Sequence, residues 1–138
     1  MSVNAERLAE FISDIERAGE RLRPLGALPL EEFMAGEDNQ DIARSRLLIA
    51  IQAALGICYH VCAQETSHVP RDYADCFRTL GKAGIIETEL AERLAAMAKF
   101  RNLLIHVYWE TDFRLVHRFI REGFDDLDAF VHEVARLV

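Results

Sequence analysis

Apolar residues return every three or four positions along most of this chain, which is the period of an α-helix that buries one face. In the N-terminal segment this spacing runs from Leu8 to Leu22, with charged residues between the apolar ones. A helix is therefore predicted over about residues 4–23. Proline disfavours helical geometry in the residue before it, so the helix is expected to stop before Pro24 and residues 24–29 to form a loop.

The rest of the chain continues the same pattern between residues that cap or break helices. Asp38 is expected to cap a long helix that starts at about Asn39 or Asp41, Thr88 is expected to cap a later one, and Gly123 marks a break near the end. The predicted segments are a short turn at 30–35 and helices at about 39–65, 71–82, 88–110 and from 112 onward. No segment alternates like a strand, so the sequence predicts an all-α fold, an antiparallel bundle of about five helices in a single domain over residues 1–138.

The charge balance limits the kinds of partner that the surface can bind. The chain has 16 Lys and Arg against 23 Asp and Glu, a formal net charge of −7. This argues against a protein that coats nucleic acid, because such affinity comes from neutralising phosphates over a broad surface. A local basic cleft is still expected if the following cations gather in space: Arg71, Arg78, Lys82, Arg101 and Arg114 or Arg118.

Neither a targeting segment nor a membrane-spanning run is expected. Charges recur every few residues at the N-terminus, and the longest apolar region, residues 47–61, is broken by Gln52 and His60. Three cysteines cannot all pair within one chain, and nothing marks an oxidising compartment. A cytoplasmic protein with reduced thiols is predicted.

The three cysteines also bear on metal binding. Cys58 and Cys62 lie four residues apart on one face of a predicted helix, and Cys76 is isolated in the sequence. A structural zinc site needs four ligands, usually from two Cys/His clusters, and no second cluster is present. Buried thiols are therefore predicted, with no metal site.

Residues 99–109, KFRNLLIHVYW, place four polar groups within the most apolar turns of a predicted helix. At 100° per residue, Arg101 and Tyr108 share a face, and Asn102 and His106 form an adjacent pair. Arg101 and His106 are about 140° apart, so the guanidinium has to reach round the helix. The segment is predicted to carry a polar stripe with a cation, an amide, an imidazole and a phenol.

These residue types suit the cleavage of RNA. RNA supplies its own nucleophile, the 2′-hydroxyl, so cleavage without a metal needs only an acid–base group and a cation for the charge that develops on the phosphoryl group. Histidine titrates near neutrality, and arginine offers a planar fork for phosphate oxygens. A buried His106 bonded to Asn102, with Arg101 solvated at the bundle edge, would give the same pattern, and this structural interpretation stays open.

Three stretches together resemble a known family. The segment from Arg101 to Tyr108 resembles the Arg-x4-His-x-Tyr motif of the HepT-like HEPN ribonuclease toxins (the DUF86 family). Residues 46–52, RLLIAIQ, resemble the family's second-helix pattern, and residues 70–85 resemble its Pro-x-x-Tyr-x-Asp-x-Phe-x-x-Leu-x-x-x-Gly-Ile run. The resemblance covers about residue 42 to the C-terminus and does not extend to residues 24–39, which are expected to be a looser insertion.

The resemblance implies a toxin of the MNT/HepT type (type VII-like toxin–antitoxin systems). In such a protein Arg101 and His106 are the catalytic pair of a metal-independent endoribonuclease, and Asn102 is a supporting polar group. Tyr108 is the residue that a nucleotidyltransferase antitoxin adenylylates. The implied partners are an RNA substrate (mRNA or tRNA), the antitoxin and a second copy of the chain in a homodimer, with no cofactor.

A second class of function is compatible with the same sequence. A helical module of this architecture could bind a partner protein or a nucleotide without catalysing a reaction. The two hypotheses differ in whether His106 is needed for RNA cleavage.

Overall fold

The computed structural model describes residues 2–106 and 111–138, without the side chain of His106. All of the secondary structure in these residues is α-helical, as predicted, in seven helices rather than about five. Their bounds are α1 Ala5–Ala27, α2 Leu30–Ala35, α3 Glu37–Glu65, α4 Tyr73–Lys82, α5 Thr88–His106, α6 Phe113–Glu122 and α7 Phe124–Ala135.

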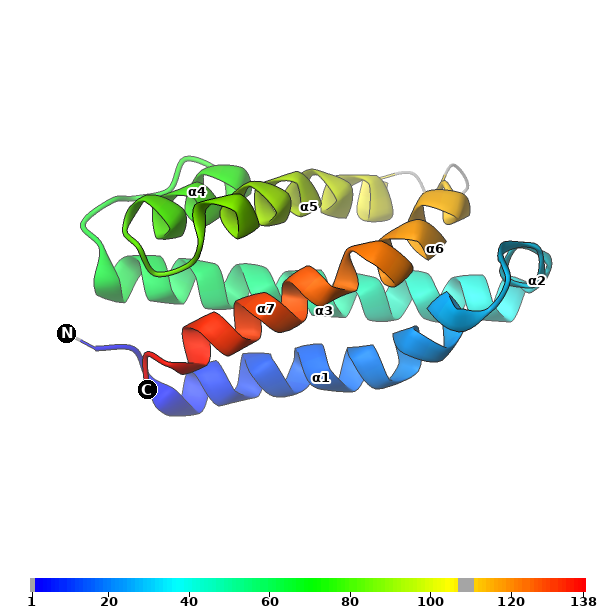
Figure 1. Cartoon of the computed structure of the whole chain (residues 1–138), viewed down its shortest axis with the longest axis horizontal. Coiled ribbons are helices and arrows are strands. Elements are labelled where there is room, and N and C mark those ends of the chain that lie inside the picture. Colours follow the sequence, from blue (N-terminus) through cyan, green and yellow to red (C-terminus); the bar gives the residue numbers. More distant parts are fainter. Residues whose placement is uncertain (1, 107–110) are drawn as a thin grey trace.

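The long helices lie lengthwise along one another (Figure 1). Helix α3 runs through the middle and contacts α1 on one side and α4, α5 and α6 on others. Helices α4 and α5 pack together, and α6 and α7 run obliquely between α5 and α1. The start of α1 and the end of α7 lie at the same end of the bundle.

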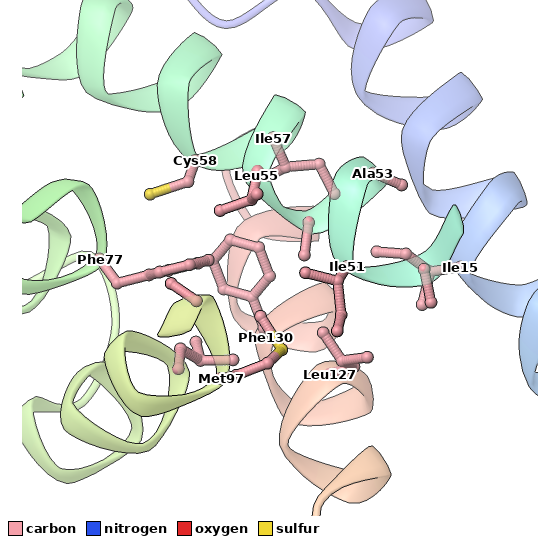
Figure 2. Packing of buried hydrophobic residues seen from close by; sticks show 14 of the residues in the cluster. Ile15, Ile51, Ala53, Leu55, Ile57, Cys58, Phe77, Met97, Leu127 and Phe130 are labelled. Atoms are coloured by element: carbon pink, nitrogen blue, oxygen red, sulfur yellow. The ribbon is translucent and has the colours of Figure 1, made fainter. Parts of the chain in front are cut away.

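One hydrophobic core joins these helices (Figure 2). Ile51 and Ile57 on α3 face inward, together with Leu127 and Phe130 on α7. The ring of Phe77 on α4 meets that of Phe130 edge-on, with 5.5 Å between ring centroids. Because α3 is surrounded on several sides, its buried residues do not form the single narrow stripe of a surface helix.

Helix α3 is also long and apolar enough, by length and composition alone, to cross a membrane. More than half of its most apolar stretch is buried inside the bundle. This burial is typical of the central helix of a packed bundle, so its apolar character is explained by the core.

The prediction that the first helix stops before Pro24 is wrong. Helix α1 continues through Pro24 to Ala27. Leu25 and Gly26, which follow the proline, are both buried, and α1 contacts α6. Burial of this last turn against α6 outweighs the hydrogen bond that the proline cannot make.

The prediction of a loose insertion over residues 24–39 is also wrong, although the short helix at 30–35 is confirmed. Phe33 in α2 is fully buried, and its ring lies 5.1 Å from the ring of His117 on α6. His117 Nε2 is 2.8 Å from the carbonyl oxygen of Leu28, just after α1. Two contacts with His117 therefore anchor the segment to α6.

Helix α3 begins at Glu37, two residues before Asn39 and four before Asp41, the two predicted starts. Gly36 occupies the N-cap position, and Asp38, the predicted cap, lies inside the first turn, where its charge still favours the positive helix end. The side chain of Gln40 donates to the carbonyl oxygen of Met34 at 2.8 Å. This bond ties the start of α3 to α2.

Gly26 is expected to be intolerant of a side chain. A Cβ there would lie 2.6 Å from Cγ2 of Ile120, a buried residue of α6. Overpacking of this kind costs about 1–3 kcal/mol, partly offset by the better helix propensity of alanine, so Gly26→Ala should lower the free energy of unfolding by about 1–2 kcal/mol in urea titrations. The matched control is Gly56→Ala, where the close atoms belong to the ring of the half-buried Phe11. That ring can rotate away. A decrease in the free energy of unfolding in Gly56→Ala as large as in Gly26→Ala would therefore contradict the packing argument.

Candidate active site

Arg101 lies at the point where three helices meet. It is half-buried on α5, and its Nε donates to Oε1 of Gln52 on α3 at 3.3 Å. Its guanidinium carbon stands 5.1 Å from the ring centroid of Tyr73, the first residue of α4. Its Nη1 donates to Oδ1 of Asn102 at 3.3 Å. The guanidinium therefore contacts three neutral groups, from α3, α4 and α5.

A network of hydrogen bonds fixes the start of α4 and with it Tyr73. The Asp72 carboxylate caps the helix by accepting from the backbone N–H of Asp75 at 2.8 Å. The Asp75 carboxylate accepts from the backbone N–H of Arg71 at 2.9 Å and lies 2.8 Å from Nε2 of His68. The loop between α3 and α4 is thus tied to the first turn of α4.

This network lowers the pKa of the Asp75 carboxyl to about 2, first through the hydrogen bond with His68 and then through that with the Arg71 backbone. A carboxyl whose pKa falls on folding stabilises the folded protein at pH values above its unfolded pKa of about 3.9. That stabilisation is lost as the pH falls toward 2.

Asp75→Asn is therefore expected to lower the melting temperature at neutral pH, with a difference from the wild type that shrinks between about pH 4 and pH 2. Thermal melts across this range measure the effect. Asp72→Asn is the control, because asparagine caps a helix about as well as aspartate. A difference between Asp75→Asn and wild type that is constant across the range would contradict the assignment.

The remaining predicted site residues are only partly described. Asn102 is exposed on α5 beside Arg101. His106 is the last residue of α5; at a rise of 1.5 Å per residue it stands about 7.5 Å from Arg101 along the helix axis. The side chain of His106 and the whole of Tyr108 lie outside the described residues.

Three of the six cations predicted to gather around a cleft lie close to carboxylates. Arg71 lies 3.7 Å from Asp75, Arg78 pairs with Glu92 at 3.1 Å, and Arg118 pairs with Glu122 at 3.4 Å. The bond with Glu92 raises the pKa of Arg78. Among the described residues, Arg101 has no carboxylate within ion-pairing distance.

The cysteines are buried, as predicted, but Cys76 is not isolated in space. Its Sγ lies 2.6 Å from that of Cys58, so α4 meets α3 at this point of the core. Burial raises the pKa of the Cys58 and Cys62 thiols. Within the described part of the chain, no three His, Cys, Asp or Glu side chains form a group that could hold a metal ion.

The sequence offered a signal for one residue that the site prediction omitted. Gln52 is a polar interruption in the apolar run of α3, and the structure shows that it faces Arg101. Tyr73 carried no such signal, because an aromatic residue near a helix start is ordinarily read as a core residue. Only the packing of α4 against α5 brings it to Arg101.

The arrangement of helices is that of solved HEPN toxin structures. The tri-AMPylated HEPN toxin of Shewanella oneidensis, solved in complex with its MNT antitoxin, matches with a TM-score of 0.85 and 21% identity over 96% of this chain and 99% of that one. A toxin–antitoxin crystal structure with AMP-PNP matches with a TM-score of 0.82 and 21% identity over 95% of this chain and 99% of that one. At this identity the likeness concerns the fold.

The family follows from the sequence match. Residues 4–134 match the family described as ribonuclease HepT-like, so this chain belongs to that family. A tRNA nuclease HepT from Aphanizomenon flos-aquae is 26% identical over 87% of this chain and 82% of its own length. An mRNA nuclease HepT from Shewanella oneidensis is 25% identical over 67% of this chain and 69% of its own length.

Proposed function

We propose that this protein is the endoribonuclease toxin of a toxin–antitoxin pair, with Arg101 and His106 as its catalytic pair. The observation that carries the proposal is membership of the ribonuclease HepT-like family over residues 4–134, with the Arg-x4-His-x-Tyr sequence present at residues 101–108. The relatives cleave tRNA and mRNA, which supports RNA as the substrate class. The protein acts in the cytoplasm, where these RNAs are found.

In the proposed cleavage reaction His106 transfers the proton and Arg101 stabilises the developing charge. His106 accepts the proton of the 2′-hydroxyl of the RNA. The 2′-oxygen attacks the adjacent phosphorus, and the bond from phosphorus to the 5′-oxygen breaks. Protonated His106 then returns the proton to the 5′-oxygen, which gives a 2′,3′-cyclic phosphate and a 5′-hydroxyl. Arg101 stabilises the negative charge that develops on the phosphoryl oxygens, and Asn102, which accepts a hydrogen bond from Arg101, supports it.

The proposal includes a homodimer. The motif helices of two copies line a shared cleft, so that Arg101 of one protomer serves the partner's His106. This arrangement removes the difficulty that positions 101 and 106 lie about 140° apart around one helix.

Tyr108 is the proposed site of inactivation by an MNT-type nucleotidyltransferase antitoxin. The related Shewanella toxin is AMPylated and was solved with its MNT antitoxin, which supports this assignment. An adenylyl group on Tyr108 adds bulk and a negative charge near Arg101. It blocks phosphate entry by occupying space and by competing for the cation.

The direct test of the function is RNA cleavage by the purified protein in the presence of EDTA. Because neither the nucleophile nor the acid–base group needs a metal, cleavage is expected to continue at an unchanged rate in the chelator, with products ending in a 2′,3′-cyclic phosphate. Cleavage that stops in EDTA and returns with added Mg²⁺ would refute the metal-independent mechanism. No cleavage in either condition would favour a non-catalytic binding module.

A further inference from the structure

We infer that Tyr73 and Gln52 are positioning residues for Arg101. They present its guanidinium to the RNA phosphate in one orientation. The inference rests on the proposed function, because it gives these residues a task only if Arg101 acts on the phosphoryl group. Tyr73 faces the guanidinium at 5.1 Å, and Gln52 accepts from Nε at 3.3 Å.

The two contacts constrain different features of the guanidinium. The contact with the face of Tyr73 fixes the position of the guanidinium over the ring, because a cation is attracted to the negative face of an aromatic ring. The hydrogen bond to Gln52 fixes the direction of the Nε–H and so limits the rotation of the group. One N–H of Nη1 is engaged with Asn102, which leaves the second N–H of Nη1 and both N–H groups of Nη2 to bind phosphate oxygens.

Both positioning residues are themselves held in place. Tyr73 is the first residue of α4, which Asp72 caps, and its ring meets that of Tyr59 edge-on at a centroid distance of 5.8 Å. Gln52 stands on α3, whose neighbouring residues Ile51 and Ala53 are buried in the core. A preorganised cation avoids the cost of ordering a long side chain during the reaction.

The neutrality of these contacts matters for catalysis. A carboxylate beside Arg101 would compete with the phosphate for the cation, whereas an amide oxygen and an aromatic face orient it and leave its positive charge uncompensated. Among the described residues, the contacts of Arg101 are with Gln52, Tyr73 and Asn102.

The test compares Tyr73→Leu with Tyr73→Phe, since phenylalanine keeps the ring face and leucine removes it. Tyr73→Leu is expected to lower kcat for RNA cleavage about 3- to 30-fold, the range that corresponds to a cation–π contact, with KM changed less than twofold. Tyr73→Phe is expected to stay within about twofold of the wild type. A loss in Tyr73→Phe as large as in Tyr73→Leu, or no loss in either, would overturn the role of the ring.

Gln52→Leu provides a second arm on an exposed position, where folding is not at risk. It is expected to lower kcat by a similar factor, whereas Ser45→Leu, an exposed substitution two turns earlier on the same face of α3, is expected to leave kcat unchanged. Equal activity of Gln52→Leu and wild type would overturn the role assigned to Gln52. Should Tyr73→Leu fail to fold, the comparison of Gln52→Leu with Ser45→Leu still tests whether a neighbouring residue orients the guanidinium of Arg101.

A readout independent of activity separates this inference from the proposed function. In a ¹⁵N-labelled protein, the Nε–H resonance of Arg101 is identified by its absence in Arg101→Lys. Loss of the ring current should shift this resonance in Tyr73→Leu but leave it nearly in place in Tyr73→Phe. If the resonance does not shift in Tyr73→Leu, the positioning inference fails. If it shifts while the wild-type protein cleaves no RNA, the proposed function fails, although the contact between Tyr73 and Arg101 is real.

Discussion

Replacement of His106 by alanine is expected to reduce the rate of RNA cleavage by about 10²–10⁴-fold, the usual contribution of a positioned acid–base group. Alanine cannot accept the 2′-hydroxyl proton or return one to the leaving oxygen. In cells, expression of the wild-type chain should arrest growth and degrade an RNA species, and expression of His106→Ala should do neither.

The matched control is His132→Ala, which removes an exposed histidine from α7, on a different helix from Arg101. It should cleave RNA at the wild-type rate. If His106→Ala and the wild type cleave RNA and affect growth alike, His106 is not the catalytic acid–base group. A non-catalytic module that binds a protein or a nucleotide then becomes the better description.

Replacement of Tyr108 by phenylalanine is expected to abolish neutralisation by the antitoxin while RNA cleavage is retained. Adenylylation joins the phenol oxygen to the α-phosphorus of ATP with loss of pyrophosphate, and phenylalanine has no such oxygen. Cells that express Tyr108→Phe together with the antitoxin should therefore stop growing, whereas cells with the wild-type pair should grow.

The chain offers a suitable control, because it has only three tyrosines. Tyr59 is half-buried on α3 against Tyr73, and Tyr59→Phe should still gain adenylyl groups, as measured by mass spectrometry of the intact protein. Equal modification of Tyr108→Phe and wild type would show that another residue is the acceptor. A neighbouring gene for a small nucleotidyltransferase with a Gly-Ser-x10-Asp-x-Asp sequence would identify the antitoxin to use.

The helices could be predicted because their apolar spacing is local information. The short helix at 30–35 and the start of a helix near residue 112 were visible in the sequence and are present in the structure. The stop at Pro24 was wrong because the deciding contact is tertiary: Gly26 meets Ile120, which lies more than ninety residues later in the chain. A local rule about proline cannot weigh that burial.

The candidate site likewise has features that the sequence could predict and contacts that it could not. The prediction of a polar stripe within residues 99–109 needed only local information, because it rests on the helical spacing of residues within one segment. The contacts of Arg101 with Gln52 and Tyr73 were not, since they join residues far apart in the chain. The approach of Cys76 to Cys58 was missed for the same reason.

Because both chain ends lie at the same end of the bundle (Figure 1), away from the C-terminal end of α5, the molecule is well suited to labelling. A fluorescent protein or affinity tag on either end would project from the far end of the bundle. Such fusions should keep their effect on growth, which would allow the protein to be followed in living cells and captured together with its bound RNA.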